Sequence, residues 1–93
     1  MTKIVLEDNG KKGRFVLFED EQQAGEIIFT WAGTNKFIIE HTEVDSRFGG
    51  KGYGKKLVLE AVDFARKNKH HIIPLCPYAK TVFERNENLQ DVL

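Results

Sequence analysis

Hydrophobic and polar residues alternate along the first half of the chain, and short polar segments interrupt the alternation. Four runs, at residues 3–7, 14–19, 25–31 and 36–44, are rich in the β-branched and aromatic residues that favour strands. The segments between them carry Asn, Gly, Asp and Gln, which favour turns. Turns this short join neighbouring antiparallel strands, so the first half predicts an antiparallel meander.

The hydrophobic period changes after residue 54. Apolar residues recur there with helical spacing, at Leu57, Val58, Ala61, Val62 and Ala65, which predicts an amphipathic helix over residues 54–67. Residues 71–75 predict a fifth strand, central and buried, and residues 77–85 a short second helix with Pro77 in its first turn. The tail, residues 89–93, predicts a last strand or extended segment. The expected fold class is therefore α+β, a mostly antiparallel sheet of five or six strands with two helices, in one domain spanning residues 1–93.

Composition narrows the function classes. The chain has 93 residues, and its 14 Lys and Arg balance its 14 Asp and Glu, which argues against non-specific nucleic-acid binding. The lone Cys76 fits a reducing compartment, and no apolar run resembles a signal peptide or a membrane span. Cys76 and the three histidines are too few and too widely spaced for a structural zinc site. We therefore expect a cytoplasmic protein that binds no nucleic acid, membrane or metal.

A glycine-rich loop lies between the fourth strand and the first helix, with Gly49, Gly50, Gly52 and Gly54. Glycine lets the main chain turn tightly and present several N–H groups in one direction. The start of the following helix adds partial positive charge, so the junction is suited to an anion. A flexible turn without a ligand is the alternative interpretation of the glycines alone.

Lysines in this loop favour the anion site. Lys51, Lys55 and Lys56 lie in the loop or in the first helical turn, where cations oppose the helix dipole. No acidic residue lies between Asp45 and Glu60 to offset them. The conflict is relieved if a polyanion binds, so the loop predicts a phosphate or pyrophosphate site.

Two familiar phosphate motifs do not match this loop. The P-loop pattern needs a hydroxyl where Lys56 stands, and the Rossmann pattern needs a glycine where Lys55 stands. The loop instead resembles the acetyl-CoA loop of the GCN5-related N-acetyltransferases, whose signature is Q/R-x-x-G-x-G/A. Gly52 and Gly54 fill its two glycine positions, and the Q/R position holds Gly49.

The order of elements from residue 14 to residue 85 is also similar to that family. Residues 39–44 and 76–80 resemble its small, single-domain bacterial branch. The resemblance implies a minimal acyl-CoA N-acyltransferase fold, acetyl-CoA as cosubstrate, and transfer of the acetyl group to an amine acceptor. Acceptor identity is open, because the helices that wall the family's acceptor site have no counterpart here.

The resemblance also implies which residues contact acetyl-CoA. They are Val44, Asp45, Gly49, Gly50, Lys51, Gly52, Tyr53, Gly54, Lys55, Tyr78, Ala79, Lys80 and Phe83. The glycine-loop amides would hold the pyrophosphate, and main-chain groups near Val44 and Asp45 the pantetheine. Phe83 stands where the family has a tyrosine that acts as an acid.

Cys76, His41 and Glu43 are the candidate catalytic residues. Strand alternation places His41 and Glu43 on one face with Phe37 and Ile39, and the resemblance places the thioester nearby. Cys76 precedes the second helix, whose dipole lowers thiol pKa, and we expect it to face His41 across the acetyl group. Cys76 would form an acetyl-cysteine or donate a hydrogen bond. The alternatives are a structural histidine, a solvated carboxylate and a buried thiol.

Three functions therefore stay open. The first is a GCN5-related acetyltransferase, and the second is a non-catalytic module that binds acetyl-CoA with an incomplete active site. The third is a small interaction domain whose loop holds no ligand. Aromatic residues on a bare sheet face would make a homodimer possible, so a monomer or a homodimer is expected.

Overall fold

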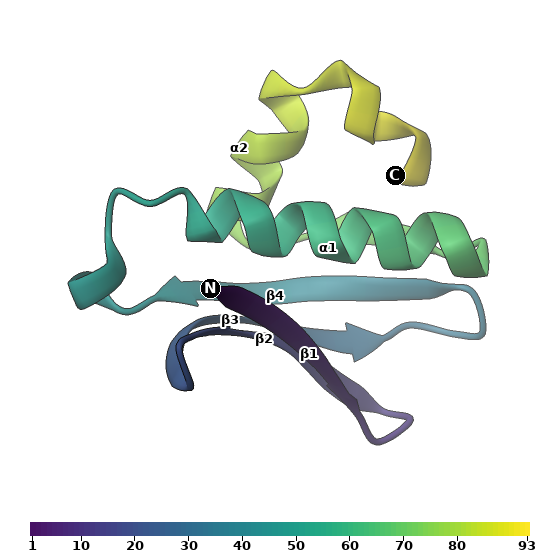
Figure 1. The fold of residues 1–93 in the computed structure, drawn as a ribbon. Coiled ribbons are helices and arrows are strands. Elements are labelled where there is room, and N and C mark those ends of the chain that lie inside the picture. Colours follow the sequence, from purple (N-terminus) through teal and green to yellow (C-terminus); the bar gives the residue numbers. More distant parts are fainter.

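The computed structural model describes residues 1–93 as one five-stranded sheet with its helices on one side (Figure 1). The strands are β1 (Thr2–Asp8), β2 (Lys12–Glu19), β3 (Gln22–Trp31), β4 (Lys36–Val44) and β5 (His71–Pro74). They lie side by side in chain order, the first four antiparallel and β5 parallel to β4. The predicted α+β class and mostly antiparallel sheet are confirmed.

The helical segments follow β4. A 3₁₀ turn, η1 (Ser46–Phe48), leads into α1 (Tyr53–Asn68), and α2 (Pro77–Arg85) is followed by a second 3₁₀ segment, η2 (Glu87–Val92). The expected final strand is wrong. Leu89 and Val92 of η2 are buried against the helices instead. Arg66 of α1 forms an ion pair with Asp91 of this segment, with 2.7 Å between Nη2 and Oδ1. Neither α1 nor α2 has the length and apolar content that a membrane-crossing helix requires.

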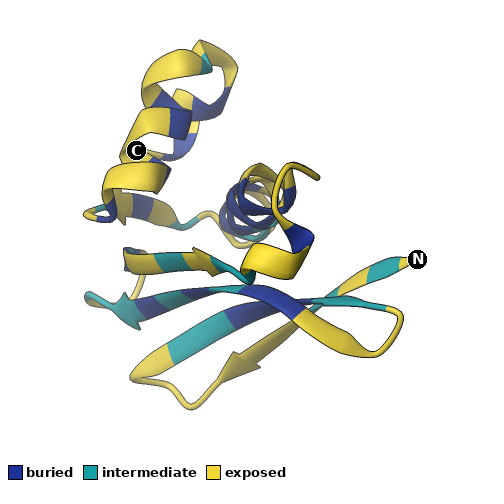
Figure 2. Ribbon diagram, turned by 90° about the vertical axis from the view of Figure 1, so that its left-hand side faces the viewer, coloured by how far each residue is buried: buried dark blue, intermediate teal, exposed yellow.

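The main core lies between the sheet and α1. The predicted apolar face of α1 is fully buried, and aromatic rings from β3, β4 and α1 pack there in tilted and edge-on contacts, with the Phe29 and Phe37 ring centroids 5.0 Å apart. Figure 2 shows buried residues along α1 and in the strands next to it, and mostly exposed residues in the strand farthest from the helices. The expectation that β5 is central and buried is wrong, because no later strand pairs with it, it forms an edge, and only Ile72 of its four residues is buried.

A β-bulge in β4 decides where the candidate residues point. Ile28 of β3 pairs with His41, whereas the next residue, Phe29, pairs with Ile39, so Glu40 is an extra residue. Up to Ile39, the core-facing residues follow the predicted alternation. Beyond the bulge the alternation is shifted by one residue.

Thr42 and Val44 consequently lie on the helix side of the sheet, where they line a cavity. His41 and Glu43 lie on the open side, with 55% and 67% of their side chains exposed. The prediction that His41 shares a face with Phe37 and Ile39 is therefore wrong. A one-residue shift moves every later side chain to the other face.

Gly25 of β3 marks a close approach between the sheet and α1. A Cβ at this position would lie 2.8 Å from the main-chain oxygen of Glu43 and 3.2 Å from Cδ1 of Leu57. We expect Gly25→Ala to lower the free energy of unfolding by about 1–3 kcal/mol, because the backbone of β4 must move. Urea denaturation measures this.

The matched control is Gly49→Ala. Gly49 has an extended backbone with φ −64°, and its nearest neighbour would be 3.4 Å from the added Cβ. The free energy of unfolding should then change by less than about 0.5 kcal/mol. Equal stability of the two variants would contradict the close packing at Gly25.

Candidate functional site

The end of β4, the glycine loop and the first turns of α1 and α2 enclose a cavity of about 330 Å³. Its walls come from one continuous stretch, residues 42–54, and from Tyr78 of α2. The lining residues are Thr42, Val44, Phe48, Gly49, Gly50, Gly52, Tyr53, Gly54 and Tyr78. The pairing of β4 with β5 stops at Ile39 and Pro74, so the lining residues Thr42 and Val44 lie beyond the paired part of β4. The glycine loop therefore forms one side of a real cavity.

The backbone of the loop requires glycine at two positions. Gly50 and Gly52 adopt φ values of +80° and +76°, in the left-handed region that side chains disfavour. Gly52 is also the N-cap of α1, so no side chain caps the first amide groups of that helix. These amides lie at the cavity wall and stay available to an anion.

The loop lysines differ in their partners. Lys51 Nζ lies 2.8 Å from Oε1 of Glu19, which also accepts a hydrogen bond from the hydroxyl of Tyr53. The expectation that no carboxylate offsets these lysines is therefore wrong for Lys51. The sequence hides the pair, because Glu19 lies 32 residues earlier, at the end of β2.

The other two lysines of the group have no carboxylate partner. Lys56 donates to Thr2 Oγ1 at 2.9 Å, and Lys55 makes neither an ion pair nor a side-chain hydrogen bond. Hydrogen bonds from Lys51 and Tyr53 lower the pKa of Glu19, and the Glu19 hydrogen bond raises the pKa of Tyr53. Lys55 is thus the loop cation that is free to meet a phosphate.

Cys76 lies at the N-cap of α2, and only 5% of the residue is exposed. Its Sγ is 3.4 Å from Oγ1 of Thr42, which lines the cavity. Burial raises the pKa of the thiol, but hydrogen bonding to Thr42 and to the amides of Ala79 and Tyr78 outweighs it, so the pKa lies below its usual value. The predicted lowering of the thiol pKa by the start of a helix agrees with this environment.

His41 and Glu43 form a separate pair, with 3.3 Å between Nε2 of His41 and Oε2 of Glu43. The pair lies on the open face of the sheet, and the sulfur of Cys76 contacts Thr42 instead. The expectation that Cys76 faces His41 across the acetyl group is wrong, because the bulge turns His41 to the open face while Cys76 contacts Thr42. The catalytic roles of these residues stay a prediction.

Comparison with known proteins identifies the family. Residues 14–92 match the sequence model of the GCN5-related N-acetyl-transferases. The chain belongs to this family. A GCN5-like protein from Staphylococcus aureus, solved by solution NMR, is 32% identical over 95% of this chain and 85% of that one, with a TM-score of 0.71. Among curated proteins, none matches significantly.

More distant acetyltransferases share the fold. The ribosomal-protein-alanine N-acetyltransferase of Brucella melitensis biovar Abortus is 18% identical over 83% of this chain and 62% of its own, with a TM-score of 0.71. An Elizabethkingia anophelis GNAT acetyltransferase, solved with acetyl-CoA bound, is 10% identical over 78% and 63%, with a TM-score of 0.68. The chain thus spans less than two thirds of either enzyme.

Several residues that the family resemblance suggested do not reach the cavity. Ala79 and Phe83 are buried in the core on the inner face of α2, and Asp45 receives hydrogen bonds from Arg47. Lys80 is exposed on α2. The seven suggested residues that do line the cavity are Val44, Gly49, Gly50, Gly52, Tyr53, Gly54 and Tyr78.

Two lining residues were missed by the sequence analysis. Thr42 was not named because the strand alternation pointed to His41 and Glu43, and the bulge reverses that alternation. Phe48 lies in η1, where the residue spacing carries no helical pattern. Its ring is buried, and the ring centroids of Phe48 and Tyr53 lie 6.4 Å apart. A single aromatic residue in a polar loop was the available signal for Phe48.

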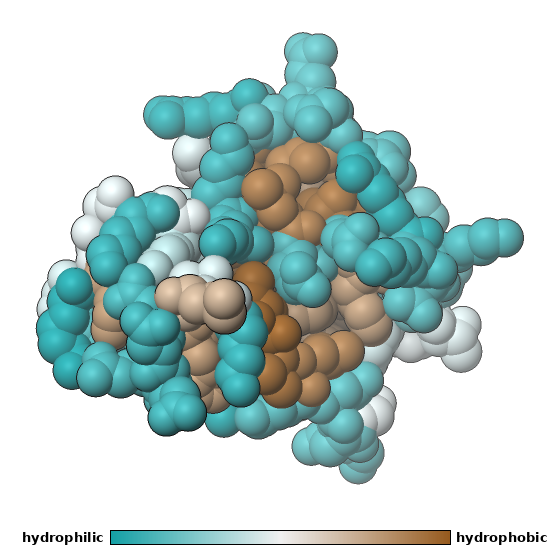
Figure 3. Space-filling model, in the orientation of Figure 1, coloured by the Kyte–Doolittle hydropathy of each residue, from teal (hydrophilic) through white to brown (hydrophobic).

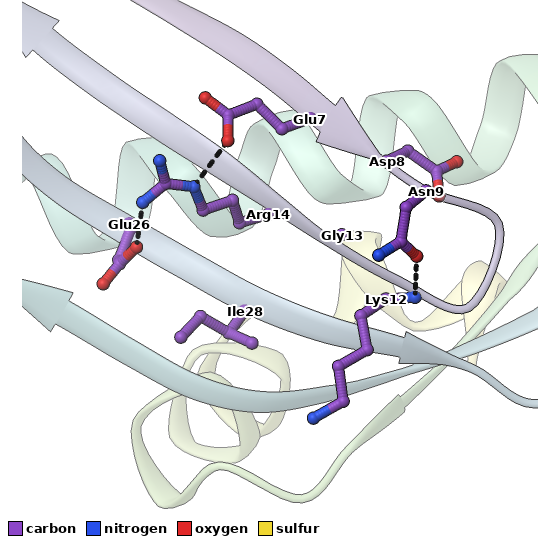
Figure 4. A pocket seen from close by; sticks show the side chains of 8 residues that line it. All are labelled: Glu7, Asp8, Asn9, Lys12, Gly13, Arg14, Glu26 and Ile28. Carbon is purple, nitrogen blue, oxygen red and sulfur yellow. Dashed lines mark hydrogen bonds and ion pairs between the residues drawn. The ribbon is translucent and has the colours of Figure 1, made fainter.

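A larger cavity, about 640 Å³, lies elsewhere, on the open face of β1, β2 and β3 (Figure 4). Its lining is mostly polar, and Arg14 bridges Glu7 at 2.8 Å and Glu26 at 2.9 Å. Arg14, Glu7 and Glu26 pair with one another there, and the lining holds no thiol, hydroxyl or imidazole. The loop cavity is therefore the better candidate for chemistry in this family member.

Proposed function

We propose that this GCN5-related protein binds acetyl-CoA in the loop cavity and transfers the acetyl group to an amine. One observation carries the proposal: a single cavity joins the glycine cradle at the uncapped start of α1 to Thr42, which contacts the Cys76 thiol. The cradle suits phosphates, and a thiol of lowered pKa suits thioester chemistry. The acetyl-CoA bound to the Elizabethkingia relative supports the choice of cosubstrate.

The loop residues would share the binding of the cosubstrate. Amides from Gly50 to Gly54 would hold the pyrophosphate, and Lys55 would add a point charge beside it. Lys51 would contact the phosphates only after breaking its ion pair with Glu19. Main-chain groups near Val44 and Asp45 would hold the pantetheine, and Tyr78 and its neighbours would border the far end.

The chemistry needs a base for the acceptor and a group near the thioester. His41 with Glu43, on the opposite face of the sheet from the cavity, would take the proton only from an amine that approaches the thioester from that open face. Cys76 has two possible uses. As a thiolate it would form a bond to the acetyl carbon while the CoA thiolate leaves and takes up a proton. The amine would then attack the acetyl-cysteine, lose its proton to the base and release the Cys76 thiolate. Alternatively, Cys76 would donate a hydrogen bond while the amine attacks acetyl-CoA directly.

A non-catalytic acetyl-CoA-binding module is the second candidate. Phe83 stands where the family's tyrosine acid is expected, and its side chain is buried in the core. Between β1 and β2 there is only a turn, so no helix walls the acceptor side. These observations favour binding without turnover.

Two measurements on one sample separate these functions. Calorimetry measures acetyl-CoA binding, and a thiol assay measures CoA release in the presence of an amine panel containing polyamines, amino acids and lysine peptides. Transfer predicts binding and amine-dependent CoA release. Binding without release supports the module, and no binding contradicts both.

Lys55 provides a test of the phosphate contact. We expect Lys55→Glu to weaken acetyl-CoA binding at least about tenfold, because an attractive charge beside the phosphates becomes repulsive. The affinity for S-acetyl-pantetheine, which lacks the pyrophosphate, should fall much less in this variant. Lys36→Glu makes the same charge change at an exposed residue at the start of β4 and should leave both affinities unchanged. Equal effects of the two variants would contradict the assigned contact.

A further inference from the structure

β1 is an unprotected edge of the sheet. It pairs with β2 along one side, and no strand pairs with its other side. The residues on which α1 packs lie chiefly in β2, β3 and β4, so β1 extends beyond the helical layer (Figure 1). Such an edge presents free N–H and C=O groups that can pair with another strand.

The side chains of this edge are partly apolar and exposed. Val5 and Leu6 are 39% and 38% exposed. Figure 3, in the orientation of Figure 1, shows hydrophobic surface where β1 crosses the front of the molecule. The strand contains no proline and no bulge that would prevent pairing.

The sequence of β1 is complementary to itself in antiparallel orientation. With Val5 opposite Val5 of a second copy, Lys3 of each copy lies opposite Glu7 of the other, and Ile4 lies opposite Leu6. Lys3, Val5 and Glu7 share the open face, so both charge pairs form on the same side. Directly opposed residues of opposite charge stabilise a strand pair, and like charges destabilise it.

We infer that β1 is the docking surface for a second copy of this chain, which joins two sheets across a two-fold axis at Val5. The charge pattern selects this occupant, because the register that aligns the apolar residues also aligns both ion pairs. Glu7 already binds Arg14 at 2.8 Å, and Arg14 keeps its bond to Glu26 at 2.9 Å when Glu7 is shared. Pairing through β1 does not depend on the ligand of the glycine loop.

Sedimentation equilibrium over a concentration series tests this pairing. A single strand pair is a small interface, so the dimer should form as the concentration rises from about ten micromolar to about one millimolar. Lys3→Glu and Glu7→Lys should each raise the dissociation constant at least about tenfold, because two attractions become repulsions. An equimolar mixture of the two variants should restore the dimer, since the introduced glutamate of one copy then meets the introduced lysine of the other.

The control variant is Lys36→Glu, which changes the same charge at the start of β4 and should dimerise like the unmodified chain. Circular dichroism checks that every variant is folded. A monomer mass over the whole series would overturn the inference. A dimer that neither variant weakens, or that the mixture does not restore, would place the interface elsewhere and would also overturn it.

Discussion

Cys76→Ala is expected to reduce acetyl-CoA-dependent CoA release at least about hundredfold, while acetyl-CoA affinity changes less than about threefold. The thiol is almost fully buried at the N-cap of α2, beside a cavity-lining hydroxyl, and its pKa lies below the usual value. A residue that acts on the thioester affects turnover, whereas in the proposed complex the phosphates are held elsewhere, by the glycine loop. Steady-state kinetics and calorimetry on the same preparation separate the two effects.

Thr42→Val is the matched variant. It keeps the Cys76 thiol and removes the Thr42 hydroxyl, whose Oγ1 lies 3.4 Å from Sγ of Cys76. Thiolate is the deprotonated form, so activity that depends on it rises with pH through the thiol pKa. Losing the Thr42 hydrogen bond raises that pKa, so the rising limb of the profile should move to higher pH. An unchanged profile would show that Thr42 does not control the thiol, and full turnover by Cys76→Ala would exclude a catalytic role for Cys76.

Intact-mass measurement separates the two uses of Cys76. A covalent route predicts one added acetyl group on Cys76 after brief incubation with acetyl-CoA and acid quenching. Direct transfer predicts an unmodified protein with the same loss of activity in Cys76→Ala. His41→Ala tests the base in the same assay. It should reduce turnover, and its intact mass after incubation with acetyl-CoA should show the same state of Cys76 as in the unmodified chain.

Gly54→Ala is expected to weaken acetyl-CoA binding about tenfold or more. Gly54 is the second residue of α1, and a Cβ there would lie 2.8 Å from the hydroxyl oxygen of Tyr78 and 2.9 Å from its Cζ. Both residues line the cavity, so the ring must leave its place in the wall. Alanine favours a helix over glycine by about 0.5–1 kcal/mol, so lost helicity cannot explain weaker binding.

The double variant Gly54→Ala with Tyr78→Ala tests this contact. If the steric conflict causes the loss, Gly54→Ala should have little effect on affinity once the Tyr78 ring is removed. The double variant should then bind acetyl-CoA about as tightly as Tyr78→Ala alone. Calorimetry of the four proteins gives the coupling between the two sites. Additive effects would show that Gly54 acts without Tyr78.

The fold was largely predictable because its signals are local. The strand alternation, the turn residues and the spacing of Leu57, Val58 and Ala61 each act within a few residues, and the structure reproduces these elements. The tail failed for a non-local reason. Residues 87–92 lack a strand partner and are held as a 3₁₀ segment by Arg66 and by burial of Leu89 and Val92.

The site was less predictable because it depends on two long-range features. The bulge at Glu40 turns His41 and Glu43 away from Cys76 and brings Thr42 to it, and a single strand sequence does not reveal a bulge. The Lys51–Glu19 pair joins residues that only the sheet brings together. The conformation of the glycine loop was predictable, because it depends on glycines that are adjacent in sequence to the start of the helix.

A heteronuclear NMR titration of the isotope-labelled chain with acetyl-CoA, with ATP as the comparison ligand, decides whether the loop cavity is the cosubstrate site. We expect saturable shifts with acetyl-CoA at the amides of Gly49, Gly50, Gly52 and Gly54 and around Thr42 and Cys76, and no matching set with ATP. The absence of shifts at these amides at millimolar acetyl-CoA would show that the cavity does not bind it.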